Sequence, residues 1–454
     1  MISFDQILET KIGTGLYQGR TLLIIGLVEF CDGVEYTFMS ILIAILQSEW
    51  NLNNAQVATL GSSFIFGVVF GNLLCAFLAD RIGRKITFSI FTGLSSFLVF
   101  YTSFSNSYGE MIILRICFGL VFGTTCPLGF IFISEVTEAK YRGRFAFGLS
   151  LLYIFGKIYL VFLCFFFLDS YTSGNWRGLI RFNGIPITSA FILSLFFVKE
   201  TIRYYLNQEE YQKAFEEIEN NIKENGRENV QLLDEDKKGL QEWSQKQIQE
   251  QREQNLHVYG VLSNEYRKET LLLWLVCILT NLQNMSIYLL MPFLFAENNS
   301  GFSPMLNMFI IEFLFALIIY NLIDNPRYGG RVRIMAFSAA ALTIANGLLY
   351  ILKNNFLYVG LFIIKISTRG LFSTIGLLCC ETYPLYLRSQ GSGLVQAIGK
   401  IGAIPSPYFL FPLFFIDPYL PFGLMCILST VILTVTCFFN QDKTQKHLEM
   451  LKEE

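Results

Sequence analysis

Long apolar runs separated by short polar intervals dominate this chain of 454 residues. A helix needs about 20 apolar residues to cross a bilayer core of about 30 Å, because each residue rises about 1.5 Å. About a dozen runs meet this criterion, and each predicts a membrane-spanning helix. The runs cover residues 20–46, 55–79, 86–106, 110–134, 145–168, 177–198, 270–295, 302–323, 333–352, 356–380, 390–414 and 417–439.

One long polar interval divides these runs six and six. Residues 199–269 are charged and rich in Gln and Asn, which is typical of a cytoplasmic linker. We therefore expect an all-α membrane protein with twelve transmembrane helices in two pseudo-symmetric six-helix bundles. The expected parts are an N-terminal bundle (1–198), the linker (199–269), a C-terminal bundle (270–440) and a tail (441–454).

Inside the linker, Phe215, Ile218 and Ile222 have the spacing of a short amphipathic helix. A solvated surface helix with no function of its own would show the same spacing. The pattern therefore predicts a helix here and leaves its role open.

Composition and charge agree with a membrane protein and exclude several other classes. The chain is 53% hydrophobic and 15% charged, too apolar for a soluble fold. Lys and Arg gather in alternate loops, so the positive-inside rule places both termini and the linker in the cytoplasm. The first apolar run is too long for a cleaved signal peptide.

No pattern in the chain indicates a cofactor, a metal or an enzyme. The ten cysteines fall within the runs without a CxxC pair, and both histidines, His257 and His447, lie outside them, so we expect no metal site. A GxxxxGK[ST] motif and a nucleophile–base pair are both lacking, which argues against an ATP-driven pump and against an enzyme. We also expect no nucleic-acid partner.

A short motif occurs once in each half. A glutamate stands seven residues before an arginine after the fourth run and again after the tenth, and a glycine follows each glutamate by 21 residues. The two copies are Glu135, Arg142 and Gly156, and Glu381, Arg388 and Gly402. Such a repeat indicates a duplicated bundle with a substrate site near mid-membrane between the halves.

Three carboxylates interrupt the first run. Glu29, Asp32 and Glu35 are spaced by three, so they fall on one helix face and point to the bundle interior or a water-filled path. Each costs roughly 2.5 to 3.5 kcal/mol on insertion. Proton or cation coupling explains them, with Asp32 the first candidate, and an ion pair that locks helices together is the alternative.

Basic residues also lie deep in the runs. Lys157 and Lys400 stand at mid-depth, while Lys365 and Arg369 are four apart and share a face. Glu312 lies in the middle of the eighth run and can pair with one lysine. The remaining cations favour an anionic substrate group such as a carboxylate, with an organic cation or a neutral sugar as alternatives.

Neutral polar residues and glycines mark two further features. Asn281, Gln283 and Asn284, near the start of the seventh run, suit the binding of hydroxyls or carbonyls, and could equally join helices. GxxxG spacings predict close helix packing. The glycines concerned are Gly67 and Gly71, and Gly119 and Gly123.

Several of these motifs resemble the major facilitator superfamily. The loop LADRIGRK (78–85), the series Arg115-x-x-x-Gly119-x-x-x-Gly123, the segment from Lys199 and Glu381-x-x-Pro384-x-x-x-Arg388 are similar to its signatures. The chain is similar to the synaptic vesicle 2-related branch, and the fit is strongest over roughly residues 25–85, 110–211 and 370–405. The resemblance implies that Arg115 belongs to a central polar network. It also implies a cytoplasmic gating set of Asp80, Arg84, Glu135, Arg142, Glu381 and Arg388.

The sequence thus predicts a secondary active transporter of a small organic solute, with an organic anion favoured, that works by alternating access with proton coupling. We expect a multi-pass monomer in a lipid bilayer. A non-transporting receptor or scaffold of the same fold, or an uncoupled sugar or organic-cation facilitator, is the alternative.

Overall fold

The computed structural model describes residues 3–439 apart from 228, 255–260, 264–265, 324–329 and 384. Side chains of some further helical residues also lie outside the described part, among them Asp80, Glu381 and Arg388. The described chain is almost wholly helical, and a two-stranded hairpin, β1 (Leu168–Ser170) with β2 (Ser173–Gly174), joins two of the helices.

The predicted runs fall on helices of the structure, and all but one of them correspond to a single helix. The first six are α2 (Leu16–Trp50), α3 (Asn54–Ile82), α4 (Arg84–Thr102), α5 (Tyr108–Val136), α6 (Ala139–Phe167) and α7 (Trp176–Phe197). The others are α11 (Arg267–Glu297), α12 (Ser303–Ile323), α13 (Arg331–Leu352), α14 (Leu357–Thr382), α15 (Leu385–Ile401) with α16 (Ser406–Phe414), and α17 (Leu420–Thr436). The run at 390–414, expected as one helix, is therefore two helices, which meet at a turn next to Pro405.

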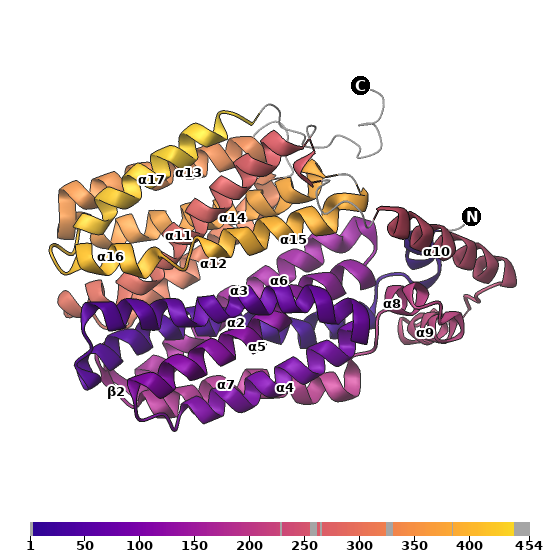
Figure 1. The fold of residues 1–454 in the computed structure, drawn as a ribbon, viewed down its shortest axis with the longest axis horizontal. Coiled ribbons are helices and arrows are strands. Elements are labelled where there is room, and N and C mark those ends of the chain that lie inside the picture. The colour runs from indigo at the N-terminus through magenta and orange to yellow at the C-terminus, as the bar shows by residue number, and fades with distance from the viewer. Residues whose placement is uncertain are drawn as a thin grey trace.

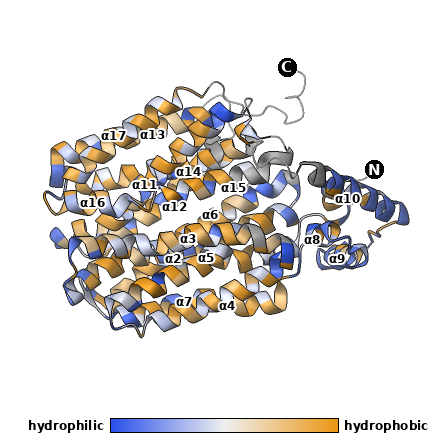
Figure 2. Cartoon of the chain, in the orientation of Figure 1, coloured by the Kyte–Doolittle hydropathy of each residue, from blue (hydrophilic) through white to orange (hydrophobic). Residues whose placement is uncertain are grey.

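The helices form two sets that lie side by side. Figure 1 shows α2–α7 on one side of the molecule and α11–α17 on the other. Large apolar side chains such as Phe196, Phe337 and Ile416 are exposed on the bundle surface, and Figure 2 shows hydrophobic residues over the length of these helices. A surface of this kind suits contact with lipid.

By length and composition, seven segments of the described chain can cross a membrane. One of them, Arg331–Cys379, has 49 residues and contains α13, a 3₁₀ turn η3 (Lys353–Phe356) and most of α14. A single helix of that length would exceed about 70 Å, far beyond a bilayer. α13 and α14 instead reverse at Lys353, where φ is +50°, and pack against each other.

Glycines bring the helices of each half together. A Cβ at Gly67 or Gly119 would collide with backbone of the facing helix, so the GxxxG stripes of α3 and α5 are in backbone contact, as predicted. The repeated glycines behave alike. A Cβ at Gly156 would strike the carbonyl of Phe30, and one at Gly402 that of Ile278. In both halves, the fifth predicted run of the half thus packs closely on the first.

Contacts between the halves close one end of the bundle. Tyr408 Oη donates to Thr59 Oγ1 at 3.1 Å, and Ser62 Oγ donates to the carbonyl of Ile404 at 2.7 Å. Both contacts involve the start of α3 and the region of α16, at the end of the bundle away from α8–α10 (Figure 1). We call this the closed end.

At the opposite end the linker forms its own small core. Its helices are α8 (Ile202–Asn207), α9 (Tyr211–Glu224) and α10 (Asp234–Gln254), which are hydrophilic outside (Figure 2). The N-terminal segment, α1 (Phe4–Ile7) and the π-helical turn η1 (Leu8–Ile12), packs on them. The shared core includes Phe4, Ile7, Leu8, Ile12, Ile202, Leu206, Ile218, Ile222 and Leu240. We call this unit the linker cluster; residues 4–12 belong to it, although we expected them in the N-terminal bundle.

Candidate functional site

The acidic face of α2 lies inside the bundle, as its spacing predicts. Glu35 is buried and accepts a hydrogen bond from Arg115 Nη1 of α5 at 3.0 Å. The guanidinium also lies 5.2 Å from the ring of Phe38 and 5.9 Å from that of Phe118. For Glu35, the structure therefore gives the ion pair that joins two helices of one half.

Asp32 faces the other half of the molecule. Its Oδ1 accepts from Cys126 Sγ at 3.8 Å, and it interacts electrostatically with Lys400 of α15. Lys400 also faces Glu29 and Tyr36. Among the described residues, neither Asp32 nor Lys400 has an oppositely charged group within the 4.0 Å of an ion pair. Both side chains are half-buried.

Glu29 is a second buried charge of the acidic face. Only 5% of it is exposed, and its Oε1 has no hydrogen-bond partner in the described part of the chain. It lies against Gly129 of α5 and interacts with Asp32, Lys400 and Arg369. A buried carboxylate without a donor is costly in its charged form. Glu29 and Asp32 therefore form one acidic pair that faces cations of the C-terminal half.

A second buried ion pair bridges the two halves. Lys157 Nζ of α6 lies 2.5 Å from both carboxylate oxygens of Glu312 on α12, and Lys157 is fully buried. The ammonium is also 4.9 Å from the rings of Tyr153 and Phe309. Glu312 thus pairs with a lysine, as one of the two sequence interpretations expects, and that lysine comes from the opposite half.

Two further cations stand on one face of α14, as their spacing predicts. Lys365 is buried, with its Nζ 3.1 Å from the ring centroid of Tyr288 on α11. Arg369 Nη2 donates to the carbonyl of Ser150 on α6 at 3.3 Å. Both interact electrostatically with Glu312. Glu29, Asp32, Lys157, Glu312, Lys365, Arg369 and Lys400 therefore form one group, which we call the central cluster.

Three tyrosines of this cluster do not stand out in the sequence. Tyr153 and Tyr288 approach each other across the halves with their hydroxyl oxygens 3.3 Å apart, and Tyr36 lies 6.2 Å from Tyr288, centroid to centroid. Spacing could have indicated two of them, because Tyr36 is four residues after Asp32 and Tyr153 four before Lys157. Tyr288 has no such signal.

The predicted polar residues of α11 contact different parts of the structure. Asn281 donates to the carbonyl of Cys277 at 2.9 Å and lies against Gly399, beside Lys400. Gln283 is fully buried and donates to the carbonyl of Met425 on α17 at 3.1 Å, so it joins helices within the C-terminal half. Asn284 is half-buried. Of the three, Asn281 is the one placed beside the central cluster.

The expected gating residues can be followed only in the N-terminal half. Arg84 Nη2 lies 3.4 Å from Glu135 Oε1, while Arg142 Nη2 lies 3.4 Å from Asp5 of α1. Asp5 also pairs with Arg203 of α8 at 2.7 Å. The side chains of Asp80, Glu381 and Arg388 lie outside the described part.

Glu200, next to α8, was missed by the sequence reasoning. It accepts from the backbone N–H groups of Arg84 and Lys85, both at 3.0 Å, and so caps the start of α4. Burial raises the pKa of Glu200 above its usual range, against the lowering effect of these donors. The linker is thereby fixed to the N-terminal half.

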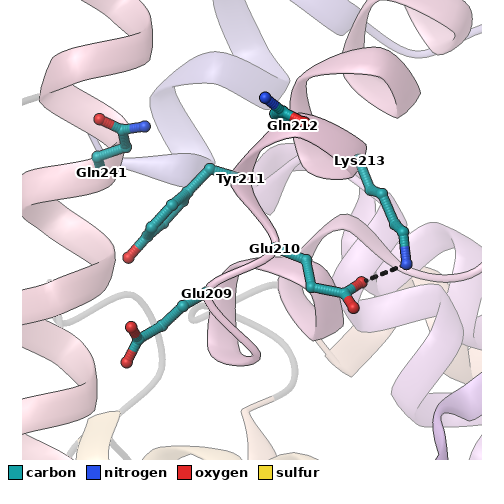
Figure 3. A pocket seen from close by; sticks show the side chains of 6 residues that line it. All are labelled: Glu209, Glu210, Tyr211, Gln212, Lys213 and Gln241. Atoms are coloured by element: carbon teal, nitrogen blue, oxygen red, sulfur yellow. Dashed lines mark ion pairs between the residues drawn. The ribbon is translucent and has the colours of Figure 1, made fainter.

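A separate depression of about 410 Å³ lies on the linker, between the turn before α9 and α10. Figure 3 shows its lining side chains, with Lys213 and Glu210 joined in an ion pair of 2.9 Å. Most of them are exposed to solvent. It is a hydrated surface hollow and does not belong to the central cluster.

Comparison with known proteins agrees with this architecture. The chain is 23% identical to the synaptic vesicle 2-related protein of Xenopus laevis over 87% of this chain and 73% of that protein. For its Rattus norvegicus counterpart the identity is 24% with the same coverage. The inward-open structure of the xylose transporter XylE from E. coli superposes with a TM-score of 0.73 at 16% identity, covering 95% of this chain and 98% of XylE. The D-xylose-proton symporter structure gives 0.71.

The family model described as Major Facilitator Superfamily matches residues 25–407. This range contains every residue of the central cluster and most of both helix sets. Members of this family are membrane transporters and not enzymes. The chain belongs to the Major Facilitator Superfamily.

Proposed function

We propose that this protein is a secondary active transporter of small organic anions, driven by protons. The observation that carries the proposal is the separation of charge across the central cluster. The N-terminal half presents Glu29 and Asp32, and the C-terminal half presents Arg369 and Lys400 toward them. The buried pair Lys157–Glu312 and the pair Glu35–Arg115 are each neutral in sum.

The charge balance favours an anionic solute. The central cluster holds four basic and three acidic side chains, one base more than acids. A carboxylate bound there would receive charge-assisted hydrogen bonds, which are roughly twice as strong as neutral ones. An organic cation would instead add to the surplus. A sugar is uncharged, so its binding would not require the surplus positive charge.

The position of Asp32 supports proton coupling. When Asp32 is charged, its carboxylate partly compensates the positive charge of Lys400. The site without solute therefore already contains a negative group near Lys400. A proton on Asp32 removes that anion, so Lys400 becomes available to the carboxylate of the solute. Proton and solute then bind together, and the empty carrier returns with Asp32 charged.

We further propose twelve membrane-spanning helices, the six from α2 to α7 and the six from α11 to α17, with the broken pair α15–α16 counted as one. Both termini and the linker cluster lie in the cytoplasm, since the basic loops with Arg81, Lys85 and Lys140 are at that end. The closed end then faces outward, and rocking of the halves opens it.

Proteoliposomes containing the purified protein test the proposal. Uptake of radiolabelled benzoate, lactate and succinate is compared with that of tetraethylammonium and xylose, with and without an inside-alkaline pH gradient. We expect uptake of at least one carboxylate, accelerated by the gradient, and loss of this acceleration in Asp32→Asn. Gradient-independent uptake would refute the coupling, and uptake of only the cation or the sugar would refute the anion assignment. No uptake of any probe would favour a scaffold.

A further inference from the structure

Glu312 is surrounded by more positive charge than it can neutralise. Both of its oxygens are taken by Lys157 at 2.5 Å, yet Lys365 and Arg369 also lie within its electrostatic reach. Arg369 has a backbone carbonyl as a partner. Two lysine ammoniums therefore compete for one carboxylate, and in this conformation Glu312 pairs with Lys157.

Lys365 is the ammonium left over. It is 98% buried, and its Nζ has no hydrogen-bond partner in the described part of the chain. The ring of Tyr288 covers one side of it. A cation–π contact offsets only a part of the cost of burying an ammonium that donates no hydrogen bond. An anion beside Lys365 in at least one state of the carrier would offset this cost.

The two lysines differ in how they move with respect to Glu312. Lys365 and Glu312 are on α14 and α12, which pack on each other within the C-terminal half. Lys157 is on α6 of the other half. When the halves rock, Lys157 separates from Glu312 while Lys365 stays near it. The carboxylate can then pass from one lysine to the other.

We propose that Glu312 is a counter-ion exchanged between Lys157 and Lys365, and that the lysine it leaves unpaired binds the anionic group of the solute together with Lys400. Lys365 has this role while the closed end is shut, as in the present structure. Lys157 has it once the halves have separated at that end. The inference rests on the proposed transport of anions and adds which residues bind the anion in each state.

Under this proposal, anion binding depends on the number of lysine ammoniums beside Glu312. Binding requires one ammonium more than Glu312 can neutralise. Lys365→Gln and Lys157→Gln each remove the surplus, so we expect affinity for the carboxylate selected from the benzoate, lactate and succinate panel to fall by about tenfold or more. Glu312→Gln keeps a surplus and is expected to retain binding.

The double variant Lys365→Gln/Glu312→Gln gives the sharpest test, because it restores one unpaired ammonium. Equilibrium binding of the radiolabelled carboxylate to purified protein should recover to within about threefold of the unmodified protein. A double variant as weak as Lys365→Gln alone would overturn the inference. Lys353→Gln, which removes an exposed lysine paired with Asp417, is the matched control and should bind normally.

A second measurement needs no solute. Cysteines at Thr59 and Tyr408, whose side chains are hydrogen-bonded at the closed end, report how often that end is shut when joined by a short bismaleimide. Lys157→Gln removes the buried ion pair with Glu312 that joins the halves and should lower cross-linking several-fold, whereas Lys365→Gln should leave cross-linking unchanged. Equal effects of the two substitutions would overturn the exchange.

The binding measurement and the cross-linking measurement distinguish a failure of the proposed function from a failure of the proposed exchange. If the unmodified protein takes up no anion, the proposed function fails, and the exchange is then judged by cross-linking alone. Single-cysteine versions of each variant show how much labelling comes from the native cysteines, of which Cys117 and Cys437 are exposed. Size-exclusion profiles of all variants confirm that they are folded.

Discussion

Replacing Arg115 by Met should be among the most damaging single changes in the N-terminal half. The guanidinium lies 3.0 Å from Glu35, and both side chains are almost completely buried. At an effective dielectric constant of about 20, two unit charges at this distance attract by about 5.5 kcal/mol. Without Arg115, Glu35 remains as a buried charge with no counter-ion, and we expect a loss of about 3–5 kcal/mol in unfolding free energy.

The assay is thermal unfolding of the purified protein in detergent. For a unit of the size of one half, each kcal/mol shifts the midpoint by about 2 °C, so Arg115→Met should lower it by roughly 6–10 °C. The double variant Arg115→Met/Glu35→Gln carries no orphaned charge and should recover more than half of the loss.

A matched pair at the surface provides the control. Arg177 and Glu49 are 3.6 Å apart, and about a third of each side chain is exposed. Arg177→Met should therefore cost less than about 1 kcal/mol. If Arg115→Met were as mild as this control, or if the double variant were as unstable as the single one, the reasoning from an uncompensated buried charge would be wrong.

Three further substitutions test other parts of the structure. Gly156→Val places a side chain against a backbone carbonyl of α2 and should abolish the monodisperse peak in size-exclusion chromatography, whereas Gly109→Val, with nothing within 4 Å, should preserve it. Asp5→Asn weakens two partly exposed ion pairs, and limited trypsin digestion should then release the N-terminal segment several-fold faster; unchanged digestion would mean that the apolar core alone holds it. Tyr288→Leu removes the ring above Lys365 and should weaken carboxylate binding by about tenfold, with Tyr288→Phe affected less; equal losses would assign the effect to the hydroxyl.

Helices were predictable from the sequence because hydrophobic length alone specifies them. The turn between α15 and α16 was missed, although Pro405 and Pro407 provide a local signal for a break. The linker cluster was also missed in part. Phe4, Ile7 and Leu8 have helical spacing, but a pattern in one segment does not reveal the separate segment against which it packs.

For the charged residues inside the bundle, sequence reasoning predicted depth and helix face but not partners. The spacing of the acids placed Glu35 inside the bundle, and the structure adds that its partner is Arg115, 80 positions away. Glu312 had three deep lysines on other helices as candidates. Glu312 pairs with Lys157, which is 155 positions away. This pairing depends on how the two halves pack together, which no local sequence pattern encodes.

The distribution of charge between the halves has a consequence that no single helix reveals. Each half alone would carry an unbalanced set, acids on α2 or cations on α14 and α15, and a buried unbalanced charge is costly. Contact between the halves brings the acids and the cations together, so the attraction between them favours the closed arrangement. A proton on Asp32 removes one negative charge from the first set, and an anion beside Lys400 offsets one positive charge of the second set. Binding of both lowers the unbalanced charge of each set by one while the halves move, which favours movement of the carrier with both bound.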